Sequence, residues 1–591
     1  MPIVTPNTLQ KSYDVIVIGS GAAGGQTAYT LTMEGAKVLM LEAGRNYDPV
    51  KETPMFQTPA QAPLRAASTP DKQQFGFYDA TVGGGWQVPG EPYTNASADP
   101  ERTFWWWRPR MLGGRTNHWG RISLRNGPYD FKPRRRDGLG FDWPIGYEDV
   151  APYYDKVEML IGVFGSNEGL ENTPDSPPGV LLPPPKFRAG ELLAQHRAKK
   201  LGMPVIPIHR AILSVRQDAD AIPKKLHPKN PAAQRVLADA MRQRAACFWA
   251  TPCIRGCSTK ANYQSTTVHL PPALATGNLD LLPNAMAREI TVDENGKATG
   301  VAYVDKQTGE ERTVKARVVV LAAGSCESVR LLLNSRSPRF PNGLANSSGR
   351  VGRYIMDTVG ASLTGQISLL ESLPPYNEDG AGGSHAYAPW WLYGEQLAGK
   401  LGFARGYHVE LNATRGMPDV NVAAHFDRFT GGSYGRQFKE DARRYYGSFM
   451  TFAGRGEMIP NEDSFCELDP TVKDKWGIPV LRFHWKWSDH ETRQAAHMQQ
   501  TFAALIEAMG GKPLAAPQSD GSKAILAGGM VIHEVGGTIM GSDAKTSVTN
   551  QWGQTWDVKN LFITDGGPFC SNADKNPTLT IMALAWRASD Y

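Results

Sequence analysis

Residues 13–42 of this chain, YDVIVIGSGAAGGQTAYTLTMEGAKVLMLE, decide its fold. A mostly apolar run without alternation, typical of a buried strand, leads into the turn Gly19-x-Gly21-x-x-Gly24, a small-residue helix and a second strand that ends at Glu42. The first glycine permits the tight turn, the second lets a pyrophosphate approach the backbone, and the third lets the helix pack on the strand. The stretch predicts a dinucleotide site in which Glu42 binds ribose hydroxyls and repels a 2′-phosphate, which leaves FAD and NAD open.

Two later apolar runs have the same buried character, and each of them also stops at a glycine. They are residues 314–325 and residues 560–566, the second of which ends in Asp565-Gly566 before a final helix from Pro577 to Asp590. Residues 360–515 alternate short strand-like runs with glycine and tryptophan, which favours an antiparallel sheet. We therefore predict an α/β fold with a discontinuous Rossmann-like nucleotide domain and an inserted substrate domain built on a largely antiparallel sheet with helices.

The boundaries of these two domains are predicted from the positions of the motifs. The nucleotide domain is expected to comprise residues 1–48, 105–130, 235–356 and 524–591. The substrate domain is expected to comprise residues 49–104, 131–234 and 357–523.

The composition excludes several classes of protein. In 591 residues, 63 Lys and Arg against 58 Asp and Glu leave a net charge of +5, too little for a nucleic-acid footprint. The longest apolar runs, such as residues 318–323, are far shorter than the roughly 18 residues that span a bilayer. Residues 1–11 lack the apolar region of an export signal, so we expect a chain with no transmembrane segment and no export signal of its own.

A second glycine-rich element, LGGRTNHWG at residues 112–120, lies too far from the first to belong to the same turn. A dissociable NAD needs no second element of this kind, whereas a permanently bound flavin does, so the element favours FAD. The candidate cofactor-binding residues in it are Gly113, Gly114, Thr116, Asn117 and His118.

Together with GSCESVRLLL at residues 324–333, these motifs resemble the glucose–methanol–choline (GMC) flavoprotein oxidoreductases over the whole chain, in particular the bacterial sugar-dehydrogenase branch. That segment has Val329 where proline is usual and Arg336 where glycine is usual, and both departures occur in that branch. The resemblance implies the GMC fold and bound FAD. It leaves a covalent link between His118 and the flavin open, and it adds cofactor contacts from Asp565, Gly566, Asn576 and Thr578.

The resemblance also implies a catalytic pair. His533, in HEVG, and Asn576, before the final helix, occupy the positions that face the reactive edge of the flavin in this family. Oxidation of an alcohol removes a hydroxyl proton as a hydride leaves the carbon, and a neutral imidazole with a pKa near working pH suits that proton. We therefore predict that His533 is the base and that Asn576 donates a hydrogen bond to the substrate oxygen.

Three of the six cysteines stand close together, as Cys247-x5-Cys253-x3-Cys257. Three thiolates can hold a soft metal centre, and structural zinc would need a fourth ligand that no nearby Cys or His supplies. A three-iron cluster needs only three ligands. The spacing resembles that of bacterial FAD-dependent glucose dehydrogenases, whose catalytic subunit holds a [3Fe–4S] cluster; the alternative is a set of reduced or disulfide-paired thiols. Cys326, Cys466 and Cys570 are predicted to be buried apolar residues.

The predicted activity is FAD-dependent oxidation of a pyranose or glycoside hydroxyl, with C3 of glucosides as the best match. An iron–sulfur cluster is useful when electrons leave singly, so it predicts delivery to a cytochrome c or a quinone. The alternatives are another polyol or sugar-acid dehydrogenase of the family and a pyranose oxidase that uses oxygen. A different class is a flavin electron-transfer protein without a substrate of its own, against which the pair of His533 and Asn576 argues.

The resemblance further implies a partner and a location. Related catalytic subunits cross the inner membrane folded, carried by a small subunit that bears the export signal. We expect the same here, which would place the protein at the periplasmic face of the inner membrane, and the alternative is residence in the cytoplasm.

Overall fold

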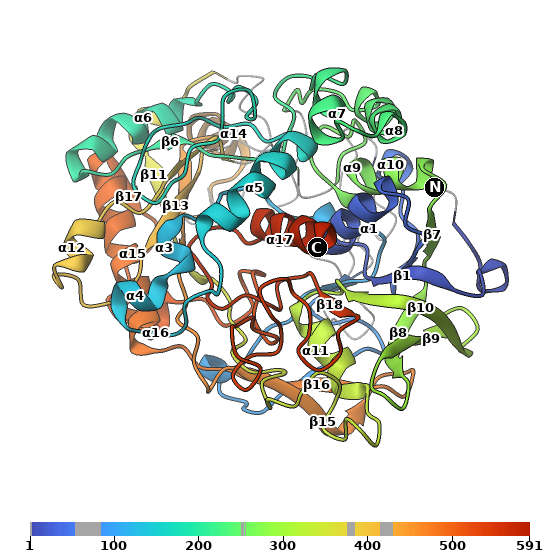
Figure 1. Ribbon diagram of the computed structural model, residues 1–591. Helices are drawn as coiled ribbons and strands as arrows, with labels where there is room; N and C mark the ends of the chain where they lie inside the picture. Colours follow the sequence, from blue (N-terminus) through green and yellow to red (C-terminus); the bar gives the residue numbers. More distant parts are fainter. Residues whose placement is uncertain (1–2, 54–83, 250–252, 254–255, 375–383, 414–429) are drawn as a thin grey trace.

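In the computed structural model of the chain, the structure describes residues 3–53, 84–249, 253, 256–374, 384–413 and 430–591. Two large sheets, one mixed and one antiparallel, lie in different parts of the molecule, and helices pack between and around them (Figure 1). The fold class predicted from the sequence is confirmed by this arrangement.

The first sheet contains seven strands in the order β7-β2-β1-β10-β9-β8, with β18 paired to β10. The strands are β1 (Tyr13–Ile18), β2 (Val38–Leu41), β7 (Leu279–Leu282), β8 (Ala285–Val292), β9 (Ala298–Asp305), β10 (Glu311–Leu321) and β18 (Leu561–Ile563). Ile16 of β1 lies beside Leu39 on one side and Val319 on the other, and Val319 in turn faces Leu561, all in parallel register. The three predicted strands therefore share one sheet. The antiparallel pairs that join β8 to β9 and β9 to the first half of β10 were not predicted.

Helix α17 (Thr578–Asp590) lies in the middle of the molecule and packs against α1 (Ala22–Met33) and α5 (Tyr147–Ile161), as Figure 1 shows. It begins one residue later than predicted, because Pro577, at φ −74°, is its N-cap residue. Proline fits there since it lacks the N–H that a first turn leaves unbonded. This packing holds Asn576, just before the helix, at the end of the first sheet.

The second sheet contains six antiparallel strands in the order β17-β11-β14-β13-β12-β6, as the sequence texture of residues 360–515 predicts. The strands are β6 (Ile206–Pro207), β11 (Val359–Ile367), β12 (Ala386–Ala388), β13 (Tyr407–Asn412), β14 (Phe449–Gly456) and β17 (Gly511–Pro513). Helix α15 (Asp489–Ala508) covers one face. Gly454 makes this approach possible, because a Cβ there would lie 2.4 Å from Met498 Sδ. Since side chains alternate along a strand, Arg455 points to the opposite face.

The other elements surround these layers. A three-stranded sheet contains β15 (Phe465–Lys473), β16 (Pro479–His484) and β4 (Thr94–Asn95), and a two-stranded sheet contains β3 (Gly84–Gly85) and β5 (Arg108–Pro109). The remaining helices are α2 (Pro49–Glu52), α3 (Pro128–Phe131), α4 (Pro133–Asp137), α6 (Ala189–Ala198), α7 (Ala221–Leu226), α8 (Pro231–Arg242), α9 (Ser265–Val268), α10 (Leu270–Ala275), α11 (Ser325–Asn334), α12 (Tyr393–Leu397), α14 (Gly435–Tyr445) and α16 (Gly521–Ala524).

The predicted domain boundaries stay a prediction, and parts of the predicted segments 49–104, 235–356 and 357–523 lie outside the described residues. Within the part of the chain that the structure describes, no helix combines the length and the apolar character needed to cross a bilayer.

Candidate active site

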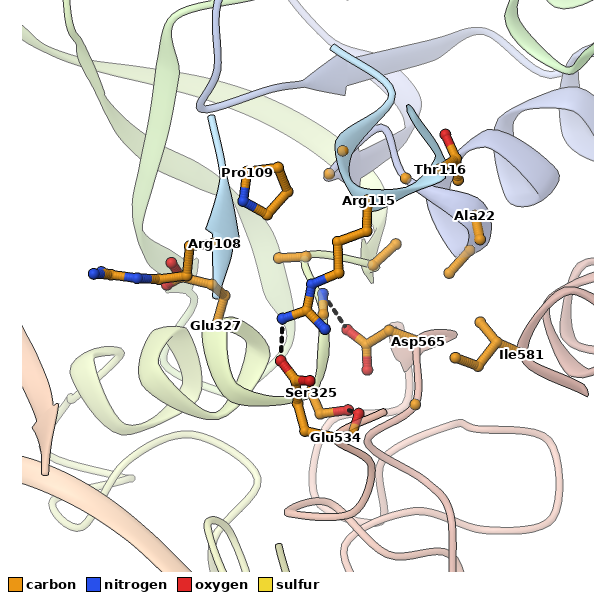
Figure 2. Close-up of a pocket in the computed structure, with 18 of the residues that line it drawn as sticks. Ala22, Arg108, Pro109, Arg115, Thr116, Ser325, Glu327, Glu534, Asp565 and Ile581 are labelled. Carbon is orange, nitrogen blue, oxygen red and sulfur yellow. Dashed lines mark hydrogen bonds and ion pairs between the residues drawn. The ribbon is translucent and has the colours of Figure 1, made fainter. Parts of the chain in front are cut away.

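A cavity of about 430 Å³ lies where the ends of the parallel strands meet one face of the antiparallel sheet, and Figure 2 shows part of its lining. Most residues predicted to bind a cofactor or to act in catalysis line it. They are Gly19, Gly21, Glu42, Gly114, Thr116, His118, His533, Asp565, Gly566, Asn576 and Thr578. Three of the predicted cofactor-binding residues do not: Gly24, Gly113 and Asn117. The structure thus brings together segments that are more than 500 residues apart in the chain.

The first glycine turn has the geometry that its sequence predicts. Gly19 has φ 101°, and a Cβ on it would lie 2.4 Å from the carbonyl oxygen of Ala322. A Cβ on Gly24 would lie 1.9 Å from the carbonyl oxygen of Gly19, so this glycine allows the helix to pack. A Cβ on Gly21 would meet nothing within 4 Å, because that position faces the open cavity. The N-terminus of α1, with its unbonded N–H groups, therefore borders the cavity.

Glu42 follows the last residue of β2 and lines the cavity beside the first glycine turn. Its carboxylate is buried and accepts hydrogen bonds from the backbone nitrogens of Ser20 at 3.1 Å and Gly44 at 2.6 Å. The side chain thus anchors the glycine turn as well as presenting an acid to the cavity.

The second glycine-rich element forms a 3-10 turn, η4 (Gly114–Asn117). It joins the first turn directly, because the backbone nitrogen of Gly113 donates to Ser20 Oγ at 2.9 Å. Asn117 is fully buried and its Nδ2 donates to the carbonyl oxygen of Leu112 at 2.9 Å, so its side chain fastens the turn and does not reach the cavity. His118 does line the cavity, and its Nε2 lies 3.2 Å from Met111 Sδ. A covalent link between His118 and the flavin, which the sequence left open, stays untested.

Charged groups line the same cavity. Arg115 extends into it and pairs with Glu534, as Figure 2 shows. Arg108 is buried, with its guanidinium 4.6 Å from the ring centre of Trp106, and its side-chain nitrogens have no hydrogen-bond partner among the described residues. In Figure 2 the guanidinium of Arg108 points away from Ala22 at the start of α1, so the fit to the diphosphate of FAD rests on the helix N-terminus and the open glycine.

His533 and Asn576 lie in contact at the other end of the cavity. Asn576 Nδ2 lies 3.3 Å from His533 Nε2, and His533 Nδ1 lies 3.1 Å from Thr358 Oγ1. Since an amide nitrogen only donates, His533 Nε2 accepts, and the ring proton sits on Nδ1 and is donated to Thr358. This assignment puts the single lone pair of Nε2 on the cavity side, where it accepts the N–H of Asn576 until a substrate hydroxyl takes the place of that contact.

The pKa of His533 differs from the sequence-based expectation. Burial is the main cause that lowers it, to about 3, with a contribution from the positive charge of Arg455, whereas Glu410 acts in the opposite direction. We expected a pKa near working pH. The imidazole is instead held neutral throughout the neutral range, and it keeps its lone pair available well below pH 6.5.

Asp357, which the sequence analysis missed, anchors the loop that carries His533. Its carboxylate accepts hydrogen bonds from the backbone nitrogens of His533 at 2.9 Å and Val531 at 3.3 Å. Burial raises the pKa of Asp357 to about 7, and the charge of Glu534 adds to this effect. No motif marks this residue in the sequence, because its role depends on a contact across 176 positions.

Two further residues that the sequence analysis missed, Glu410 on β13 and Arg455 on β14, line the cavity beside His533. Glu410 Oε2 lies 3.3 Å from Arg455 Nη2, and Glu410 Oε1 accepts a hydrogen bond from Asn576 Nδ2 at 3.5 Å. Although burial acts to raise its pKa, Arg455 and His408 lower the pKa of Glu410 to about 2. The cavity therefore presents an ionised carboxylate next to the pair of His533 and Asn576.

The three clustered cysteines line a separate small cavity of about 20 Å³. None of the six cysteines forms a disulfide, and parts of the loop between Cys247 and Cys257 lie outside the described residues. Burial raises the pKa of Cys247 to about 12, and the nearby Cys253 contributes. Cys326, Cys466 and Cys570 are buried, as predicted.

Only one group of described side chains brings its possible metal ligands within 4.8 Å of one another, and it contains Asp130, Glu457 and Asp574. Lys575 Nζ already lies 3.1 Å from Asp130 and 2.6 Å from Asp574, and Arg136 lies 2.9 Å from Glu457. The group is therefore a buried salt-bridge network. The three cysteine sulfurs lie too far apart for one metal ion, whereas bridging sulfides in an iron–sulfur cluster span a wider triangle.

Comparison with known proteins agrees with this cavity. Residues 13–358 match the N-terminal part and residues 460–585 the C-terminal part of GMC oxidoreductase. The chain is 30% identical to 2-methyl-1,2-propanediol dehydrogenase of Mycolicibacterium austroafricanum, over 98% of this chain and 94% of that protein. It is 28% identical to the fructose dehydrogenase large subunit of Gluconobacter japonicus, over 98% and 97% of the two chains.

A solved structure of formate oxidase from Aspergillus oryzae has the same fold, with a TM-score of 0.62 at 13% identity over 99% of this chain and 98% of that one. Fold and cavity define a flavin-dependent oxidoreductase that acts on CH–OH groups. The chain belongs to the GMC oxidoreductase family.

Proposed function

We propose that this protein is a dehydrogenase that oxidises a secondary hydroxyl of a pyranose or glycoside, at C3 of glucosides in the best-matched case, and passes the electrons singly to a cytochrome or quinone. The observation that carries the proposal is the contact of a neutral His533 with Asn576 in a cavity that also presents Glu410 and Arg455. When bound, FAD supplies the acceptor for the hydride.

The chain supplies the groups that handle the proton. A substrate hydroxyl that replaces the direct contact between His533 Nε2 and Asn576 Nδ2 donates its proton to the histidine and accepts the amide hydrogen bond. His533 becomes an imidazolium as the proton leaves, and the ionised Glu410 nearby stabilises that positive charge. Asp357 and Thr358 hold the histidine backbone and Nδ1, so the base keeps its orientation while it gains the proton.

The pair of Glu410 and Arg455 also suits a polyhydroxylated substrate. A carboxylate accepts hydrogen bonds from hydroxyls and a guanidinium donates them, so the two together contact hydroxyls on carbons next to the reacting one. Two relatives act on substrates that their names describe as a 1,2-diol and as fructose, and this supports a substrate with neighbouring hydroxyls.

Replacing Glu410 by glutamine removes the negative charge and keeps the shape. We expect reduction of the flavin by substrate to slow by about 10–10²-fold, because each pKa unit lost by the imidazolium corresponds to a factor of ten. Anaerobic stopped-flow absorbance measures this rate. Burial and the charge of Arg455 lower the pKa of His533, so the low-pH limb of the wild-type rate lies below pH 6.5. Glu410 raises that pKa, so its loss in Glu410→Gln moves the limb further down.

The matched control is Glu467→Gln, which removes a carboxylate that pairs with His484 on β16, away from the cavity lining. Its flavin should be reduced at the wild-type rate. If Glu410→Gln also reduces its flavin at the wild-type rate, Glu410 has no part in the proton transfer, which then depends on His533 and Asn576 alone.

The second part of the proposal is that Cys247, Cys253 and Cys257 hold a [3Fe–4S] cluster. They line one small cavity and they are free of disulfides. A three-ligand iron–sulfur centre suits this donor set. Its chemistry would be the transfer of single electrons.

A small subunit that bears an export signal and a cytochrome c acceptor are the proposed partners. The name of one relative as the large subunit of fructose dehydrogenase supports an assembly with further subunits. We propose the periplasmic face of the inner membrane as the location, reached with that partner, and the cytoplasm as the alternative.

Turnover of several methyl glycosides, with a dye acceptor and separately with oxygen, tests the proposal. We expect turnover with the dye, little with oxygen, and a 3-keto product from a glucoside. Efficient turnover with oxygen would favour an oxidase instead, and oxidation of open-chain polyols or sugar acids alone would favour the other dehydrogenases of the family. A flavin that no such compound reduces would indicate an electron-transfer protein.

A further inference from the structure

Two arginines near the cysteine cavity are buried among neutral acceptors. Arg121 Nη2 donates to the carbonyl oxygens of Thr116 at 3.1 Å and Asn117 at 3.0 Å, and Nη1 donates to that of Cys253 at 2.5 Å. Arg244 donates to Lys260 O at 3.1 Å, Gln217 Oε1 at 2.8 Å and Ile161 O at 3.0 Å. Among the residues that the structure describes, every hydrogen bond of these two guanidinium groups goes to a neutral oxygen.

A third buried arginine, Arg210, donates at 2.9 Å to the carbonyl oxygen of Gly120, which is next to Arg121 in the chain. Backbone contacts join these arginines to the cysteine loop. Arg121 Nη1 contacts the carbonyl oxygen of Cys253, and Arg244 donates to the carbonyl oxygen of Lys260, whose backbone nitrogen donates to that of Cys257 at 3.1 Å. Three buried guanidinium groups therefore lie close to the cysteine loop.

Neutral thiols cannot balance these charges. A buried guanidinium without an anion is expensive, and hydrogen bonds to carbonyl groups offset only part of that cost. Metal binding deprotonates thiols outright, and a cluster with four sulfides and three thiolates carries more negative charge than its three irons carry positive charge. Occupation of the cysteine site by such a centre would supply the missing anion.

Arg121 also connects the cysteine loop to the active site. Its guanidinium contacts the backbone of η4 and of Trp119, which border the large cavity, and on the other side the backbone of Cys253. Its own backbone has φ 63°, a left-handed conformation that is unfavourable for a residue other than glycine. Hydrogen bonds to its carbonyl oxygen, from the backbone nitrogen of Ala211 at 2.8 Å and from Ser123 Oγ at 3.0 Å, accompany the side-chain contacts at this position.

We propose that Arg121 is a positioning residue shared by the flavin cavity and the cysteine cavity. Its buried charge raises the reduction potential of an anionic cluster bound by Cys247, Cys253 and Cys257. Its guanidinium group also holds the cysteine loop against η4. This inference rests on the proposed cluster. Arg210 and Arg244 add to the positive field. A reduced cluster is more negative than an oxidised one, so a nearby cation stabilises the reduced state.

The test is a redox titration of the holoenzyme, followed by electron paramagnetic resonance, on wild type, Arg121→Gln, Arg121→Lys and the control Arg242→Gln. Arg242 is exposed on α8 and pairs with Asp220 and Asp239. In Arg121→Gln we expect the one-electron equilibrium to shift at least tenfold towards the oxidised cluster, which is about 59 mV. Arg121→Lys keeps the charge, so its cluster should have a reduction potential between those of Arg121→Gln and wild type. The cluster of Arg242→Gln should have the wild-type potential.

Iron and flavin contents separate the outcomes. A cluster present in Arg121→Gln with the wild-type potential would overturn the inference. If Arg121→Gln binds flavin but no iron, the charge is needed for assembly and Arg121→Lys must restore the iron; iron missing from both would contradict a role for the charge. Wild-type protein prepared without oxygen that contains flavin and no iron would refute the proposed cluster itself.

Discussion

Replacing His533 by alanine is expected to slow reduction of the flavin by substrate about 10²–10⁴-fold, the usual loss when a positioned base is removed. The lone pair on Nε2 faces the cavity beside Asn576, whereas the carboxylate of Glu410, which also contacts Asn576, is paired with Arg455. Anaerobic stopped-flow absorbance of the flavin measures the rate directly.

The flavin content of His533→Ala should equal that of wild type. The glycine turn and the N-terminus of α1 lie at the other end of the cavity, so loss of the imidazole leaves them intact. The control is His484→Ala, because His484 pairs with Glu467 and does not line the cavity. A wild-type reduction rate in His533→Ala would show that the base lies elsewhere.

Replacing Cys253 by serine should abolish the proposed cluster while leaving reduction of the flavin by substrate almost unchanged. The hydroxyl is a poor substitute for a thiolate towards iron, and Cys253 belongs to a cavity separate from that of His533. We expect the iron content and the electron paramagnetic resonance signal to be lost, together with electron delivery to a cytochrome.

Cys570→Ser is the matched control for this variant. Cys570 is buried, and its Sγ donates to the carbonyl oxygen of Met540 at 3.1 Å, a bond that a serine hydroxyl can also make. Iron should be retained there. If Cys253→Ser keeps its iron and its rate of cytochrome reduction, the cysteine triad is structural and electrons leave the flavin by another route.

The sequence was sufficient to predict the nucleotide sheet because its signals are local. Residues 15–18 and 561–563 are apolar runs with a glycine one to three residues further on, and such runs have few alternatives to a buried parallel strand. The same local chemistry identified Gly19, whose φ of 101° requires glycine. The antiparallel strands β8 and β9 were missed because their half-exposed residues carry a weaker signal.

The substrate end of the cavity could not be predicted in the same way. Glu410 and Arg455 meet because β13 and β14 pair in a register that brings His408 opposite Arg455, and no motif in either strand encodes that register. Asp357 and the lowered pKa of His533 depend on burial, which is a property of the assembled structure. Asn117 shows the opposite error. It was predicted to bind the cofactor because it belongs to the glycine-rich motif, but its side chain instead holds the turn through a hydrogen bond to Leu112.

Anaerobic mixing of the wild-type holoenzyme with methyl glycosides, while the flavin absorbance is recorded, tests directly whether the protein oxidises a sugar hydroxyl. We expect rapid bleaching by at least one glycoside, and much slower bleaching by the same sugar with the 3-hydroxyl removed. A flavin that stays oxidised with every sugar, polyol and simple alcohol, in protein that is folded and fully loaded with cofactor, would contradict the proposed activity.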